Sequence, residues 1–121
     1  MPKTVLIVED YDDSRSFLKF AVESYGYRVV EANDGIEAID RFKEFHPDLI
    51  LMDISLPMVN GLTTTKAIRE FSGSRHIPII AVTAFGNLYY EQVMEAGCDE
   101  LIDKPVDFEI LEPVINKYLS G

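Results

Sequence analysis

The sequence has little of what a disulfide-linked, zinc-binding or membrane protein needs. Cys98 is the only cysteine and the chain has two histidines, so no internal disulfide can form and a zinc site is not expected. No apolar run approaches the ~20 residues that span a bilayer, and the run Val5–Val8 is too short for a signal-peptide core. These absences favour a protein of the reducing cytoplasm.

Basic residues are also scarce. Eleven Lys and Arg stand against 21 Asp and Glu, which gives a formal net charge of −10. Such a charge repels the phosphates of nucleic acids and of anionic membranes, so we expect protein partners and cations, without direct nucleic-acid or membrane binding. The 121 residues contain no low-complexity tract and no composition shift. We therefore expect one domain that covers residues 1–121.

Short apolar runs indicate the strands of a buried sheet. The runs Val5–Val8, Leu49–Met52 and Ile79–Val82 are too short for helices and suit parallel strands that are covered on both faces. The weaker segments Tyr27–Glu31 and Leu101–Ile102 are typical of edge strands. We therefore predict three central strands and two edge strands.

Helix-length segments alternate with these strands. They are Asp13–Tyr25, Ile36–Phe45, Thr63–Phe71, Leu88–Ala96 and Phe108–Leu119. Five βα repeats with right-handed crossovers predict an α/β fold with a five-stranded parallel sheet of order 2-1-3-4-5, the flavodoxin-like arrangement, with helices on both faces. Pro113 lies inside the last segment and is expected to kink or split that helix.

Polar residues follow the strands on the side where such folds bind ligands. In a doubly wound sheet, ligands bind beyond the carboxyl ends of the strands, where the strand order reverses. The first strand leads into Glu9 and Asp10, the third into Asp53, the fourth into Thr83 and the fifth into Lys104. We expect these five side chains to converge on one edge.

Three converging carboxylates require a compensating charge, and a hard divalent cation is the natural one. Mg²⁺ takes oxygen ligands, so we expect Asp10 and Asp53 to bind it directly and the backbone carbonyl of Ser55 to contribute another oxygen. Glu9 is expected to reach the ion through water or to help set the charge of the site. An aspartate beside Mg²⁺ can attack a phosphoryl group as a nucleophile. Lys104 and Thr83 would then bind the phosphoryl oxygens.

Several motifs together resemble those of the response-regulator receiver family, the CheY-like proteins. They are Val5-Leu6-Ile7-Val8-Glu9-Asp10, Leu49-Ile50-Leu51-Met52-Asp53, Leu56-Pro57 with Gly61, Thr83-Ala84 and Lys104-Pro105. The resemblance implies a phosphorylation-dependent switch of a two-component phosphorelay rather than an enzyme acting on other substrates. It implies Asp53 as the phosphoacceptor, Glu9 and Asp10 as the metal-binding acids, Thr83 and Lys104 as sensors of the phosphoryl group, and a cis peptide before Pro105. The implied partners are a sensor histidine kinase or histidine phosphotransfer protein, and a downstream protein target or output domain.

Two details refine the resemblance. The segments Ile79–Phe85 and Ala96–Cys98 are most similar to single-domain DivK-type regulators and to receivers of hybrid kinases. Many receivers carry an aromatic ring three residues before the lysine, whereas this chain has Leu101. We therefore expect the signal to leave through residues 85–95, with altered exposure of Tyr89 or Tyr90, on the face formed by residues 88–96, 101–102 and 108–119.

Other interpretations of the same residues are weaker. Glu9 and Asp10 could be acids that favour a helix N-terminus, but this does not account for Asp53 and Lys104. A flavodoxin-like electron carrier would need a Ser-, Thr- and Gly-rich loop after the first strand, whereas this loop reads Glu9-Asp10-Tyr11-Asp12-Asp13. A phosphatase that uses Asp53 as its nucleophile would usually carry a second acid at the position of Ser55. Whether the receiver acts alone or within a longer protein stays open.

Overall fold

The computed structural model describes residues 2–54, 60–73, 76–84 and 86–120. Strands and helices alternate along the chain. They are β1 (Thr4–Val8), α1 (Asp12–Ser24), β2 (Arg28–Ala32), α2 (Gly35–Phe45), β3 (Leu49–Asp53), α3 (Gly61–Ser72), β4 (Ile79–Thr83), α4 (Gly86–Ala96), β5 (Glu100–Asp103) and α5 (Phe108–Leu119). All five predicted strands and all five predicted helices are present.

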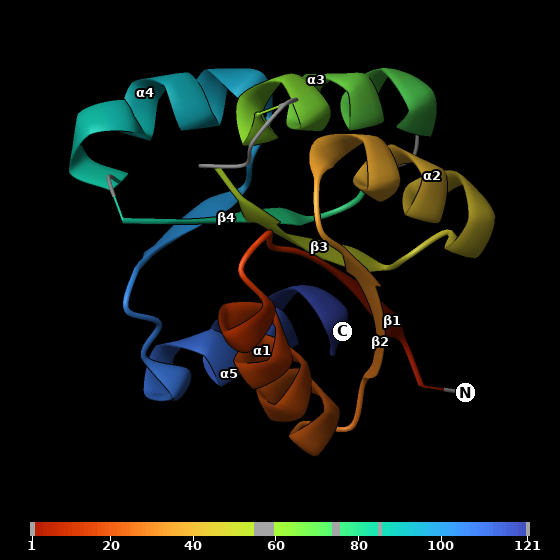
Figure 1. Cartoon of the computed structure of the whole chain (residues 1–121), viewed down its shortest axis with the longest axis vertical. Helices are drawn as coiled ribbons and strands as arrows, with labels where there is room; N and C mark the ends of the chain where they lie inside the picture. Colours follow the sequence, from red (N-terminus) through yellow and green to blue (C-terminus); the bar gives the residue numbers. More distant parts are fainter. Residues whose placement is uncertain (1, 55–59, 74–75, 85, 121) are drawn as a thin grey trace.

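The strands form one parallel sheet in the order β2-β1-β3-β4-β5, as predicted. Helices α2, α3 and α4 cover one face of the sheet, and α1 and α5 cover the other (Figure 1). The register pairs Val8 of β1 with Met52 of β3, and Asp53 of β3 with Val82 of β4. The carboxyl ends of β1, β3 and β4 therefore lie side by side.

Alternate side chains of the central strands supply the two halves of the core. On β1, Leu6 and Val8 pack with residues of α2, α3 and α4, whereas Val5 and Ile7 pack with residues of α1 and α5. All four side chains are buried. Burial on both faces explains why the strands read as continuous apolar runs rather than as alternating ones.

The boundaries of the elements lie within two residues of the predicted ones, but the predicted effect of Pro113 on the last helix differs from the structure. Helix α5 runs from Phe108 to Leu119 with Pro113 inside it, so the proline does not split the helix, and the alternative of a kink stays a prediction. Leu111 and Ile115, on either side of the proline, are both fully buried against the core, and this packing holds the two halves in one helix. Among the described residues, no helix is long and apolar enough to cross a membrane.

A polar contact far from the carboxyl edge ties α3 to β4 and to the turn before β5. The Arg69 guanidinium donates hydrogen bonds to the carbonyl oxygens of Gly97 and Ile77 and pairs with the Asp99 carboxylate at 2.9 Å. Asp99 also accepts a hydrogen bond from the backbone N–H of Ile79 and lies 2.7 Å from the exposed His76. These contacts join segments that are distant in sequence.

Candidate functional site

Three carboxylates meet at the carboxyl edge of the sheet, as the sequence predicts. Glu9, Asp10 and Asp53 each place a carboxylate oxygen within 4.8 Å of the other two. Glu9 and Asp53 are almost fully buried, with 1% and 3% of their surfaces exposed, whereas Asp10 is exposed. The cluster therefore has two buried acids and one acid open to solvent.

Backbone and side-chain contacts fix Glu9. Its N–H donates a hydrogen bond to the Ala32 carbonyl at the end of β2. One carboxylate oxygen accepts from the Lys104 ammonium at 2.8 Å, and the other accepts from the Tyr11 N–H at 3.2 Å. Glu9 is thus tied to the lysine, and a ligand of the cluster must compete with that contact.

Lys104 follows β5 and reaches across the edge to the acids. Its ammonium lies 2.8 Å from Glu9 and 3.3 Å from Asp53, and the peptide bond between Lys104 and Pro105 is cis, as the resemblance implied. Burial alone would lower the pKa of Lys104, but the hydrogen bond that it donates to Glu9 and the charge of Asp53 outweigh burial and raise the pKa. The side chain is therefore a cation at neutral pH, and it offsets one of the three carboxylate charges.

Helix α3 begins close against the end of β3, next to Asp53. The Gly61 N–H donates to the Ile54 carbonyl, and the Asn60 side chain caps α3 by accepting from the Thr63 N–H at 2.9 Å. A side chain at Gly61 would meet the Ile54 Cα at 2.7 Å and the Asp53 carbonyl oxygen even more closely. Glycine is therefore required where α3 starts beside Asp53.

Thr83 lies at the end of β4, which is the neighbour of β3. It is 1% exposed, and its carbonyl accepts a hydrogen bond from the Lys104 N–H at 2.9 Å. The strand end thus places Thr83 at the same edge as the acids and the lysine. Ser55, Leu56, Pro57 and Phe85, also singled out in the sequence, lie outside the described residues.

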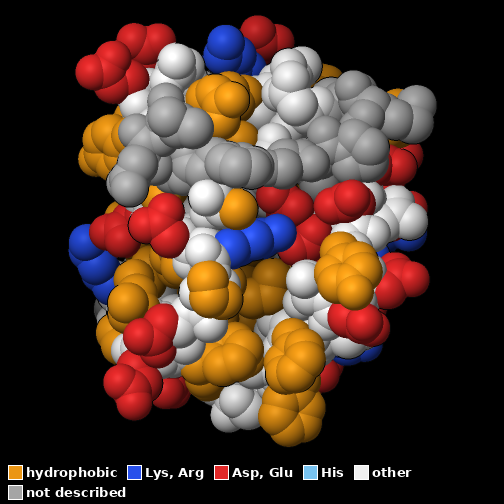
Figure 2. Space-filling model, turned by 60° about the vertical axis from the view of Figure 1, so that its left-hand side comes forward, with side chains coloured by type: hydrophobic (Ala, Val, Ile, Leu, Met, Phe, Trp, Pro, Cys, Tyr) orange, Lys and Arg blue, Asp and Glu red, His pale blue; other side chains and the backbone are white. Residues whose placement is uncertain are grey.

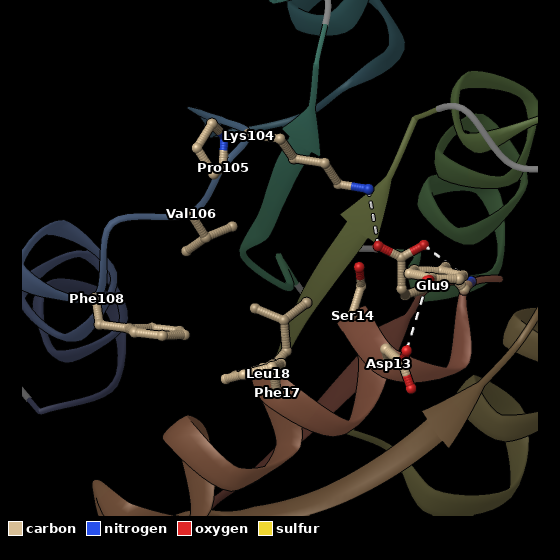
Figure 3. Close-up of a pocket in the computed structure, with 10 residues that line it drawn as sticks. Glu9, Asp13, Ser14, Phe17, Leu18, Lys104, Pro105, Val106 and Phe108 are labelled. Carbon is tan, nitrogen blue, oxygen red and sulfur yellow. Dashed lines mark hydrogen bonds and ion pairs between the residues drawn. The ribbon is translucent and has the colours of Figure 1, made fainter.

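A cavity of about 390 Å³ opens beside the acids, between α1 and the segment that joins β5 to α5. Glu9 and Lys104 form one end of its lining, and Leu18, Val106 and Phe108 converge from the two sides (Figure 3). On the surface, hydrophobic side chains gather below a band of acidic and basic ones (Figure 2). This cavity was not predictable from the sequence, because it depends on how α1 and the β5–α5 connection are spaced.

Arg15 is a further residue at this site that was not predicted from the sequence. Its guanidinium donates to the carbonyl of Glu9 at 2.9 Å and pairs with Asp12 and with Glu31 of β2. The available signal was a basic residue in the first turn of a helix whose N-terminus is otherwise acidic. Such a residue opposes the helix dipole, which suggests a role other than helix stabilisation.

Known proteins share this fold and much of this sequence. The polar-differentiation response regulators DivK of Brucella anthropi and Brucella ovis are each 42% identical over 121 residues, covering 99% of this chain and 98% of each relative. The receiver domain of the sensor histidine kinase PA1611 from Pseudomonas aeruginosa, solved with magnesium in its active-site cleft, is 30% identical with a TM-score of 0.91 over the whole of both chains. The chemotaxis protein CheY4 of Vibrio cholerae is 26% identical with a TM-score of 0.91, over 98% of this chain and all of that one.

A family model described as the response regulator receiver domain matches residues 5–116. The match includes the acids, Thr83 and Lys104. The chain therefore belongs to the response regulator receiver family, the signalling switches of two-component systems.

Proposed function

We propose that the chain, acting as one receiver domain in the cytoplasm, accepts a phosphoryl group on Asp53 in a reaction that requires Mg²⁺. The observation that carries the proposal is the position of Asp53. It is buried, clusters with Glu9 and Asp10, and lies 3.3 Å from the Lys104 ammonium. A cation and a metal-binding pair beside one carboxylate form a site that suits an incoming phosphate.

The described residues fit a magnesium ion. Three carboxylates with one ammonium leave negative charge uncompensated, and carboxylate oxygens are the ligands that Mg²⁺ prefers. Asp10 and Asp53 would bind the ion directly, Glu9 would act through water, and the Ser55 carbonyl is proposed as a further ligand. Once bound, Mg²⁺ neutralises charge on the phosphoryl oxygens and on the acids.

The transfer step itself involves Asp53 and the donor. A carboxylate oxygen of Asp53 attacks phosphorus, the bond between phosphorus and the donor histidine nitrogen breaks, and the imidazole keeps the electron pair and takes a proton from solvent. Lys104 binds a phosphoryl oxygen as the negative charge shifts to the acyl phosphate. Thr83, at the adjacent strand end, offers its hydroxyl to another oxygen.

These two contacts supply energy for a switch. Charge-assisted hydrogen bonds are worth roughly 1.5–3 kcal/mol each, so two give about 3–6 kcal/mol. Shifting a two-state equilibrium from 1:99 to 99:1 takes about 5.5 kcal/mol. Thr83 and Lys104 therefore nearly suffice if both contacts form only in the active conformation of the phosphorylated protein.

The downstream target is proposed to bind the face formed by α4, β5 and α5. Leu101 on β5 packs against the half of the core to which α4 contributes, and Tyr89 and Tyr90 are 44% and 55% exposed on α4. Exposed aromatic side chains are frequent anchors at interfaces. Leu101 has no hydroxyl that could make a different contact in the active state. The signal would therefore pass through α4.

This output surface predicts where spectra change. Adding beryllofluoride, a stand-in for the phosphoryl group, should shift the backbone amide resonances of Tyr89–Glu95 as well as those at the phosphorylation site. Matched spectra of Asp53→Asn with beryllofluoride provide the control and should show neither change. If the shifts in the wild type stay at the site and Tyr89–Glu95 are unchanged, the proposed output face is wrong.

The phosphodonor, a histidine kinase or a histidine phosphotransfer protein, is proposed to dock over the cavity beside α1. The cavity begins at Glu9 and Lys104 and continues over apolar side chains, and Phe17 and Phe20 of α1 are 66% and 76% exposed. A donor that fills this surface would bring its histidine to the edge where Asp53 lies. The apolar lining favours a partner with an apolar helical face.

The metal requirement is tested by replacing Asp10. Asp10→Asn should weaken Mg²⁺ binding by more than about 10–100-fold, the cost of losing an outer-shell partner of a metal site, because Asp10 is a proposed direct ligand. It should also slow phosphorylation by a small-molecule phosphodonor at limiting Mg²⁺. Asp13→Asn removes the same charge from an exposed residue nearby that lies outside the cluster, and should change binding less than twofold. Equal losses in both variants would show that only overall charge matters and would contradict the site.

A further inference from the structure

The backbone of Glu9 is held at its N–H by the edge strand β2 and at its carbonyl by Arg15 of α1, which itself pairs with β2. The N–H donates to the carbonyl of Ala32, the last residue of β2. The carbonyl accepts from Arg15 Nη1 at 2.9 Å, and Arg15 Nε is in turn 3.3 Å from the carboxylate of Glu31, the neighbour of Ala32. The direction in which the chain leaves Glu9 is thereby fixed, and Asp10 is the next residue.

Arg15 also holds the far end of the same loop. Its Nη2 lies 2.7 Å from the carboxylate of Asp12, the first residue of α1. One guanidinium therefore joins Glu9, Asp12 and the strand β2. Only 18% of the Arg15 side chain is exposed, which limits its freedom to adopt other arrangements.

We infer that Arg15 is a positioning residue for magnesium: by bracing the Glu9–Asp12 loop against β2, it keeps the Asp10 carboxylate beside Asp53. This inference rests on the proposed magnesium-dependent function. In this scheme Arg15 acts through the backbone of Glu9 rather than on the phosphoryl group itself. A planar guanidinium with several donors can satisfy three acceptors at once, which a lysine ammonium cannot do in the same geometry.

Electrostatics alone predicts the opposite effect of removing Arg15. Loss of a positive charge near a cation site should tighten Mg²⁺ binding, whereas loss of the brace should weaken it. The charge of Arg15 is already offset by Asp12 and Glu31, so the positional effect should dominate. The sign of the change in affinity therefore separates the two roles.

Arg15→Gln is expected to weaken Mg²⁺ binding by about tenfold, the lower end of the range for residues that orient metal ligands. The rate of phosphorylation by a small-molecule donor should fall at limiting Mg²⁺ and return to the wild-type rate at saturating Mg²⁺, because Asp53 and Lys104 are unchanged. Arg15→Lys should recover part of the affinity. Isothermal titration with MgCl₂ measures binding, and thermal melting of the same samples confirms that each variant is folded.

Lys19→Gln is the matched control. Lys19 lies on the same helix, carries the same charge and pairs with the same Glu31 at 3.5 Å, but is not bonded to Glu9. It should change Mg²⁺ affinity less than twofold. Unchanged or tighter binding in Arg15→Gln, or a rate that stays low at saturating Mg²⁺, would overturn the positioning role. Absence of Mg²⁺ binding in the wild-type protein would instead overturn the proposed function.

Discussion

Replacing Asp53 by asparagine is expected to abolish phosphorylation. The substitution keeps the shape of the side chain, which matters because Asp53 is 3% exposed at the end of β3. It removes the carboxylate that would attack phosphorus, and an amide is a far weaker nucleophile. Incubation with a small-molecule phosphodonor and Mg²⁺ should give no added phosphoryl mass on the intact protein.

Asp103→Asn is the control for Asp53→Asn. Asp103 is exposed at the carboxyl end of β5, beside Lys104 in the chain. Its replacement by asparagine removes the same charge as Asp53→Asn. It should be phosphorylated at close to the wild-type rate. Undiminished labelling of Asp53→Asn would mean that another residue is the phosphoacceptor.

Replacing Lys104 by methionine is expected to have opposite effects on metal binding and on phosphorylation. In the described structure the ammonium occupies the acidic cluster by pairing with Glu9 and Asp53. Without this competing cation, Mg²⁺ should bind more tightly, by about tenfold for each 1.4 kcal/mol of lost competition. Phosphorylation should nevertheless slow by about 10²-fold or more, the cost of removing one donor that stabilises a developing charge.

Lys117→Met controls for the loss of a surface charge and of the lysine side chain. Lys117 is exposed on α5 and pairs with Glu100 at 2.8 Å, away from the acidic cluster. Metal titration and phosphorylation kinetics of this variant should match the wild type. If Lys104→Met weakened Mg²⁺ binding, Lys104 would be supporting the cluster rather than competing for it.

The fold was predictable from sequence because its physical signals are local. Runs such as Leu49–Met52, buried on both faces, are too short for helices, and the alternation of strands and helices then restricts the order of the sheet. Pro113 was expected to kink or split the last helix, and the split is wrong, because the cost of a proline in a helix is a local rule whereas the burial of Leu111 and Ile115 is a tertiary effect. Tertiary packing overrode the local preference.

The site was predictable as a set of positions but not as a set of contacts. Strand ends determine that Glu9, Asp53 and Lys104 share an edge. The pairing of Lys104 with Glu9 joins residues 95 positions apart, and it depends on rotamers and spacing that no sequence pattern records. The same holds for Arg15 and Glu31, where one guanidinium joins a helix, a loop and an edge strand.

Mapping the phosphoryl group on the wild-type protein tests Mg²⁺-dependent phosphorylation of Asp53 most directly. The protein is incubated with a small-molecule phosphodonor in Mg²⁺ or in excess chelator, and its peptides are then identified by mass spectrometry at acidic pH. We predict one phosphoryl group, on Asp53, in the Mg²⁺ sample and almost none with chelator. A phosphoryl group on another residue, or equal labelling of Asp53 in chelator, would contradict this function.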